Sequence, residues 1–268
     1  MVNSSLSKVF LEVTLSARLA AAALLIASPF ALAQDAHAAF PSVELPARTT
    51  LPIVFTRAIS ANQAKPGDAV YARTIQVVHL PNGSTLPAGT KILGHVVSAT
   101  PFSFDRTPYA HQVPSELVIE FQTAQLNSTE LPLHVTLRAM AGPIAANSAS
   151  EPRSPDMDSL GTLTQIGGDL LVPSQKEVVD QQGDTVAYNR RDGVYAHLIA
   201  NGSCDASDNE VSVALFSPMA CGLYGFGSVS APTRVDTPTR LTLVSTHGSP
   251  QIWKHTVALL EVLPESGR

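Results

Sequence analysis

Two stretches of the chain, residues 117–122 and 131–139, alternate apolar with mostly polar side chains at a period of two. Successive side chains of a β-strand point to opposite faces of its sheet, so the alternation indicates strands with one buried face. In the second stretch one face carries Leu131, Leu133, Val135, Leu137 and Ala139, and the other carries Pro132, His134, Thr136 and Arg138. The short polar link at residues 127–130 predicts that the two strands form a hairpin.

Turn chemistry and composition extend this pattern along the chain. Residues 69–80 and 90–100 are rich in Val and Ile and flank a turn-rich segment. Gly67 and Gly83 fit turns that need a positive φ, and Gly89 allows a tight passage into the following strand. Only 15% of the residues are charged and 20 are proline, a balance that disfavours many surface helices. We therefore predict an all-β, mainly antiparallel fold that is barrel-like or sandwich-like.

A change of composition at residues 141–162 predicts a boundary. This segment lacks an apolar period and is rich in Pro, Ser and Asn, so we interpret it as a linker or mobile loop. Residues 40–140 before it form a predicted β-barrel-like domain, which such an exit should allow to fold alone. Residues 163–263 form a second β block, with strand-like runs at residues 194–199, 211–216, 223–229, 240–244 and 253–263.

The first residues have the order of a secretory leader. Lys8 and Arg18 precede an apolar core at residues 19–27, and Ala31-Leu32-Ala33 supplies the small residues of a cleavage site. We interpret residues 1–33 as a signal peptide, with Gln34 or Ala39 as the first mature residue. A retained anchor is the alternative, but the core is shorter than the roughly 20 residues a span needs. The mature protein is then periplasmic or secreted, with no integral membrane span.

The sequence contains two cysteines, Cys204 and Cys221. In an exported chain an even number of cysteines predicts a disulfide, here closing a loop around the strand-like run 211–216. The alternative is a catalytic thiol, for which His197 or His255 would be partners by residue type.

The order of turns in the first block resembles that of a known family. Residues 51–55 form an apolar run, a Pro-Gly-Asp turn follows within residues 65–72, and a Pro-Ala-Gly-Thr turn lies within residues 82–96. Over residues 45–138 the pattern resembles the C-terminal β-barrel domain of TrbI-like core-channel scaffold proteins of conjugal-transfer and type IV secretion machines. It also resembles a broad group of uncharacterised secreted bacterial proteins. The resemblance implies a β-barrel-like fold and, for the scaffold, a role in a channel.

The sequence lacks the motifs and charge patterns that are typical of several classes of function. The net charge is −5 and no basic stripe is present, so we expect no nucleic-acid partner. The sequence contains no His-Glu-x-x-His, phosphate-loop or Gly-x-Ser-x-Gly motif, so we expect neither a cofactor nor catalysis by these routes.

Two short segments carry candidate site residues. Asp205, Asp208 and Glu210 gather oxygen donors in one loop, which makes them weak candidates for a calcium site. Phe216, Tyr224 and Phe226 lie beside glycines and could form a recognition surface, for example for sugar. The alternative is that these three aromatic side chains pack around the disulfide.

These observations favour a non-catalytic exported envelope protein that binds a protein or glycan partner or supports an assembly. One alternative is an envelope-associated hydrolase acting on cell-wall or glycan material. It would need two carboxylates across a groove, drawn from Glu116, Glu120, Asp184 and Asp192. The other alternative is a subunit of a secretion channel.

Overall fold

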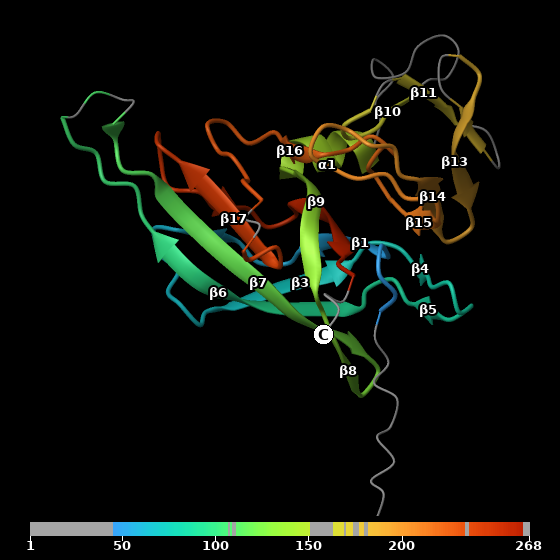
Figure 1. The fold of residues 1–268 in the computed structure, drawn as a ribbon, viewed down its shortest axis with the longest axis horizontal. Helices are drawn as coiled ribbons and strands as arrows, with labels where there is room; N and C mark the ends of the chain where they lie inside the picture. Colours follow the sequence, from blue (N-terminus) through green and yellow to red (C-terminus); the bar gives the residue numbers. More distant parts are fainter. Residues whose placement is uncertain are drawn as a thin grey trace, which may run out of the picture. The chain divides into compact units, whose positions relative to one another are not determined.

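A computed structural model describes residues 45–106, 108, 111–150, 163–168, 170–173, 177–179, 182–233 and 236–264. Within these residues strands predominate and nearly all strand pairs are antiparallel, which confirms the predicted all-β fold class (Figure 1). The expected signal peptide, residues 1–33, lies outside the described residues. No helix in the described part of the chain is long and apolar enough to cross a membrane.

The larger sheet has nine strands. In spatial order it contains β16 (Gly222–Tyr224), β9 (Val135–Ala141), β19 (Val257–Val262), β1 (Thr50–Phe55), β3 (Ala69–Thr74), β6 (Lys91–Thr100), β7 (Ser115–Leu126) and β17 (Arg240–Ser245), while β8 (Thr129–Pro132) pairs with β7. The short pair between β16 and β9 is parallel. The other ladders of this sheet are antiparallel.

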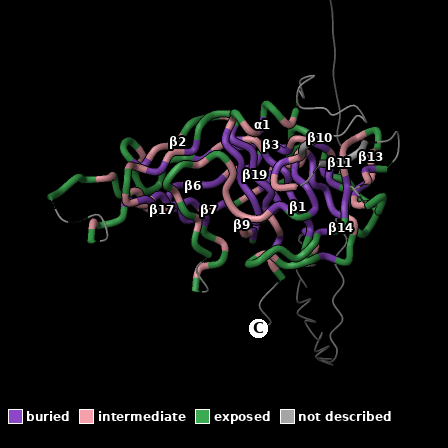
Figure 2. The backbone as a smooth tube through the Cα atoms, turned by 90° about the horizontal axis from the view of Figure 1, so that it is seen from above, coloured by how far each residue is buried: buried purple, intermediate pink, exposed green. Residues whose placement is uncertain are grey.

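One apolar core is built from strands of this sheet. It contains Leu51, Val70, Ile92, Leu117, Val135, Leu241 and Leu260, which come from seven different strands. Figure 2 shows the buried residues concentrated along β1, β19 and their neighbours. Because β9 and β17 lie near opposite ends of the strand order, their shared core requires the sheet to fold round on itself. Among the described residues no hydrogen-bonded ladder joins these ends, so the sheet does not close into a barrel and has a seam between β9 and β17.

The smaller sheet is an antiparallel meander. Its six strands are β10 (Leu163–Thr164), β11 (Leu170–Pro173), β12 (Glu177–Val179), β13 (Thr185–Arg190), β14 (Gly193–His197) and β15 (Glu210–Ser212). Two further pairs join β2 (Ile59–Ser60) to β18 (Gln251–Ile252) and β4 (Val78–His79) to β5 (Thr85–Leu86).

Specific interactions join the meander to residues 76–79, which follow strand β3 of the larger sheet. Gln76 accepts a hydrogen bond from the Val194 backbone N–H over 3.0 Å and donates to the Val194 carbonyl over 2.9 Å. The Tyr195 hydroxyl donates to the Val77 carbonyl over 2.7 Å. His79 Nε2 lies 2.6 Å from Asp192 Oδ2, and the His79 and Tyr195 rings are 5.0 Å apart. Burial, followed by the nearby Asp192 carboxylate, raises the pKa of Tyr195 above its usual value.

The predicted turns form as expected. Gly67, Gly83 and Gly89 have φ values of 91°, 80° and 80°, in the left-handed region where glycine is favoured. The hairpin expected after β7 is also present, because β7 pairs with β8 through a turn at Asn127.

The expected single strand over residues 131–139 is interrupted. The alternation holds from Leu131 to Val135, with Leu133 buried and His134 exposed. After β8 the chain leaves β7, and β9 pairs instead with β19. On β9 the polar face is covered by the loop that contains the disulfide, so Arg138 is buried rather than exposed as the alternation predicts.

The boundary expected at residues 141–162 does not divide the larger sheet. Strands β16, β17 and β19 come from the second block, and β19 lies between β1 and β9 of the first. Residues 40–140 alone therefore lack a strand from the middle of the sheet. Within the expected linker, Pro143–Ser150 forms helix α1, whose Ala146 packs against a second apolar cluster with Ala141 and Leu259. Residues 151–162 lie outside the described residues.

Candidate functional site

A cavity of about 360 Å³ lies at the seam between β9 and β17. Its walls include Leu137 and Arg138 on β9, and Arg240, Leu241 and Thr242 on β17. Other parts of the wall include Arg48, Glu261 on β19, both half-cystines and residues 231–233. Charged and apolar side chains therefore surround an open space at the seam.

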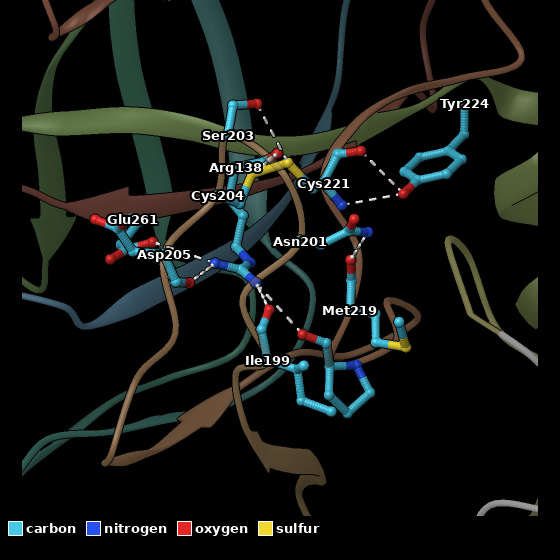
Figure 3. The surroundings of a disulfide bond; sticks show 11 residues. Arg138, Ile199, Asn201, Ser203, Cys204, Asp205, Met219, Cys221, Tyr224 and Glu261 are labelled. Atoms are coloured by element: carbon cyan, nitrogen blue, oxygen red, sulfur yellow. Dashed lines mark hydrogen bonds and ion pairs between the residues drawn. A yellow bond between two sulfur atoms is a disulfide. The ribbon is translucent and has the colours of Figure 1, made fainter.

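A disulfide closes the loop on one wall of this cavity. Cys204 and Cys221 are bonded with an S–S distance of 2.14 Å across 17 positions of sequence, as predicted. The catalytic-thiol alternative is wrong because neither cysteine is free. The Tyr224 hydroxyl accepts a hydrogen bond from the Cys221 N–H and donates to the Cys221 carbonyl, both over 3.0 Å (Figure 3). These bonds fix the end of the loop where β16 begins.

Hydrogen bonds from Arg138 on β9 hold the same region of the chain against the sheet. The Arg138 Nη2 donates to the Ile199 carbonyl over 2.8 Å and to the Pro218 carbonyl over 3.4 Å. Its Nη1 donates to the Asp205 carbonyl, and Figure 3 shows the guanidinium between these acceptors and Glu261. Arg138 thus supplies a donor to the Ile199 and Asp205 carbonyls and a second donor to the Pro218 carbonyl, which also accepts the Ile199 backbone N–H over 3.0 Å.

Arg138 and Glu261 form a loose ion pair in a desolvated position. Nη1 lies 3.9 Å from Glu261 Oε2, and the exposed fractions of the two side chains are 1% and 15%. Burial is the largest influence on both: it lowers the pKa of Arg138 and raises the pKa of Glu261, while each charge partly offsets the effect on the other. The hydrogen bonds to loop carbonyls, more than this pair, therefore account for the position of Arg138.

Arg48 makes a second connection from the sheet to the loop. Its Nη1 donates to the Ala206 carbonyl over 2.8 Å. Its backbone has φ = 65°, and its neighbour Thr49 donates a backbone hydrogen bond to Pro46 over 3.2 Å. Arg48 therefore occupies a left-handed position in a turn where glycine is favoured.

The weak calcium candidates are not gathered into a cation site. Glu210 pairs with Arg190, and the Asp208 carbonyl lies 2.9 Å from His197 Nδ1. Asp205 lines the cavity, and its carbonyl accepts the bond from Arg138. Within the part of the chain that the structure describes, no group of three or more His, Cys, Asp or Glu residues could hold a metal ion.

The three aromatic candidates do not share one surface. Phe216 is fully buried beside Ile166 and Ala220, so its ring is not available for recognition. Tyr224 is half-buried and anchors Cys221. Phe226 packs on the core of the larger sheet, and its ring centroid lies 5.4 Å from that of Trp253. Of the three, Tyr224 hydrogen-bonds to Cys221, so the alternative of packing around the disulfide applies to Tyr224.

The carboxylates that the hydrolase alternative needs are dispersed. Glu116 and Glu120 lie on β7 opposite Val244 and Arg240 of β17. Asp192 contacts His79 of β4. None of these, nor Asp184, lines the cavity at the seam. The structure gives that alternative no support at this cavity.

Sequence reasoning missed Arg138 and Glu261 as site residues. The alternation predicts an exposed face for Arg138, because it does not reveal what covers a strand. A usable signal was present at Glu261, which is the one charged residue in the apolar run Val257–Val262. A lone charge in such a run is costly to bury unless it has a partner.

Comparisons with family models, curated proteins and solved structures found no match to this chain.

Proposed function

We propose that this chain is a non-catalytic exported protein of the cell envelope that binds a partner. The observation that carries the proposal is the disulfide between Cys204 and Cys221, which fixes the loop over Arg138. Structural disulfides persist in oxidising compartments outside the cytoplasm, in agreement with the leader-like sequence at residues 1–33.

The polar side chains at the seam favour binding over catalysis, because they are engaged in structural bonds. The Arg138 guanidinium is held by loop carbonyls, and both cysteines are bonded to each other. Neither group is then poised as a nucleophile or a proton carrier. What remains is a preformed cavity with a rigid wall, which is the usual form of a binding site.

The test is the location and the activity of the natively produced protein. After osmotic shock, we expect it in the periplasmic or secreted fraction, and crosslinking in intact cells should give a discrete adduct. Purified protein should release no soluble product from cell-wall or glycan material. Retention in the cytoplasm would contradict export, and release of product would favour the hydrolase alternative.

A role in a secretion channel is a second candidate, supported by one observation. The turns that carry the resemblance to the TrbI-like scaffold connect β1, β3 and β6 in adjacent places of one sheet. A channel subunit should assemble into rings in detergent-solubilised envelopes. A monomer under the same conditions would argue against this candidate and leave the first proposal standing.

A further inference from the structure

We propose that the cavity at the seam between β9 and β17 binds a small organic anion, a carboxylate attached to an apolar body. This goes beyond the envelope partner proposed above and does not depend on it. The inference rests on the size, charge and wall chemistry of the cavity and on the conformation of Arg48.

The size and position of the cavity suit a small ligand. Its volume of about 360 Å³ lies at the lower end of the range for ligand pockets, roughly 300–1,000 Å³. The disulfide and the hydrogen bonds of Arg138 fix one wall, so a ligand would meet a formed site. Less ordering is then needed on binding, which favours affinity.

Positive charge exceeds negative charge on the walls. Three arginines, Arg48, Arg138 and Arg240, line the cavity together with the two acids Asp205 and Glu261. The chain as a whole has the opposite sign, with a net charge of −5. An anion is therefore the ligand that this cavity attracts.

Two of the arginines can reach a ligand. The Arg240 side chain is 40% exposed, and its Nε lies 3.7 Å from Glu120 at the rim. The bond from Arg48 to Ala206 uses a single N–H of a guanidinium that has several. A carboxylate is the natural partner for such donors because its two oxygens match the fork of a guanidinium.

The backbone of Arg48 supplies an independent observation. A left-handed conformation costs a non-glycine residue free energy, and such strained positions are concentrated where a side chain has a role at a site. Arg48 has φ = 65° and its side chain lines the cavity. An arginine thus occupies a position where the turn itself favours glycine, and its side chain faces the proposed ligand.

The other walls are apolar or have unused polar atoms. Leu137, Leu241 and Leu263 face the cavity with several prolines, which suits an apolar body. Thr242 Oγ1 and Arg138 Nε are buried with no hydrogen-bond partner among the described residues. Both residues line the cavity, and an acceptor brought into it could complete them after a small side-chain rotation.

The experiment is calorimetric titration of the purified protein with octanoate, octan-1-ol and acetate. Octanoate combines charge with an apolar body, whereas each of the others has only one. We expect saturable binding of octanoate, at least about tenfold tighter than either control, because a hydrogen-bonded charge contributes about 1.5 kcal/mol or more. Equal binding of octan-1-ol, or no saturable heat with octanoate, would overturn the proposal.

Variants locate the site. Arg240→Gln and Arg48→Gly should each weaken octanoate binding by about tenfold. Arg48→Gly should leave the thermal midpoint near that of the wild type, because glycine relieves the left-handed backbone as the side-chain bond is lost. Arg57→Gln is the matched control, since Arg57 is exposed and stacks over Tyr71 away from the cavity. Wild-type affinity in both cavity variants would place octanoate elsewhere and contradict the proposal.

Discussion

At the residue scale, Arg138 is the clearest example of a charge retained for its hydrogen bonds. Its guanidinium donates to the carbonyls of Ile199, Asp205 and Pro218, which lie in the two connections that flank β15. The Pro218 carbonyl also accepts the Ile199 backbone N–H. Unpaired carbonyls in such a buried place would each cost about 1–3 kcal/mol. The residue therefore determines whether the loop can lie against β9 at all.

The first prediction concerns replacement of this side chain. Arg138→Met should lower the free energy of unfolding by about 3 kcal/mol, because it leaves Glu261 without its ion-pair partner and the Ile199 and Asp205 carbonyls without this donor. Arg73→Met is the matched control, since Arg73 is an exposed strand arginine on β3, and it should change stability by less than about 1 kcal/mol. Urea denaturation measures both. Equal losses would mean that the Arg138 hydrogen bonds are unimportant.

The second prediction concerns Glu261 and pH. Burial raises its folded-state pKa above the usual 4.5, so the folded protein binds the proton more tightly than the unfolded chain. This contribution to stability is fully present below pH 4.5 and is lost as the pH rises through the raised value. The unfolding free energy of the wild type minus that of Glu261→Gln should therefore fall as the pH rises through this window. A difference that grows with pH would show that Arg138 dominates instead.

At the element scale, the segment from Cys204 to Cys221, which includes β15, depends on its covalent closure. Residues 204–221 contain no strand of the larger sheet, yet they form a wall of the cavity. Their order comes from the disulfide, from the hydrogen bonds to Arg138, and from the Asn201 amide, which donates to the Met219 carbonyl over 2.8 Å.

The third prediction is that opening the disulfide weakens this element. The double variant Cys204→Ser/Cys221→Ser should lose about 3 kcal/mol of unfolding free energy, because the unfolded chain regains the entropy of a loop of this size. Amide exchange should speed up within residues 199–221 and remain slow in β1 and β3. Uniform exchange across the chain would contradict a local role.

The fourth prediction uses the segment that joins β8 to β9. Leu133 is buried in the core of the larger sheet, whereas His134 is exposed. Leu133→Asp should therefore destabilise the fold by several kcal/mol, about 3 or more, because an unpaired charge enters the core. His134→Asp should cost less than about 1 kcal/mol. Similar melting temperatures for the two variants would refute the one-sided burial seen here.

Much of the strand content was predictable, while the pairing was not. Local alternation predicts β7, β8 and the start of β9. Glycine-containing turns predict where β3 and β6 begin. The partner of β9 was not predictable, because its pairing with β19 joins residues more than a hundred positions apart. The site was missed for the same reason: the cover over Arg138 comes from residues 199, 205 and 218, far along the sequence.

At the scale of the whole molecule, one sheet draws on both ends of the described chain. β19 pairs with β1 on one side and with β9 on the other. Its Ala258, Leu260 and Val262 side chains belong to the same core as those of β1. Removing β19 would leave backbone groups of two strands unpaired and open the core to water.

The fifth prediction follows from that position of β19. Residues 40–140 expressed alone should show no cooperative thermal transition, whereas residues 40–264 should unfold in one sharp step. Circular dichroism during heating distinguishes the two outcomes. A cooperative transition in the shorter fragment would show that residues 40–140 are an independent domain, as the composition alone suggests.

The central proposal is that the chain works outside the cytoplasm with its loop held by Cys204 and Cys221. Intact-mass spectrometry of natively produced protein, without reduction, tests both parts in one measurement. The proposal predicts a mass for a chain that starts at Gln34 or Ala39 and has its two cysteines joined. A mass that includes Met1 and two free thiols would contradict it.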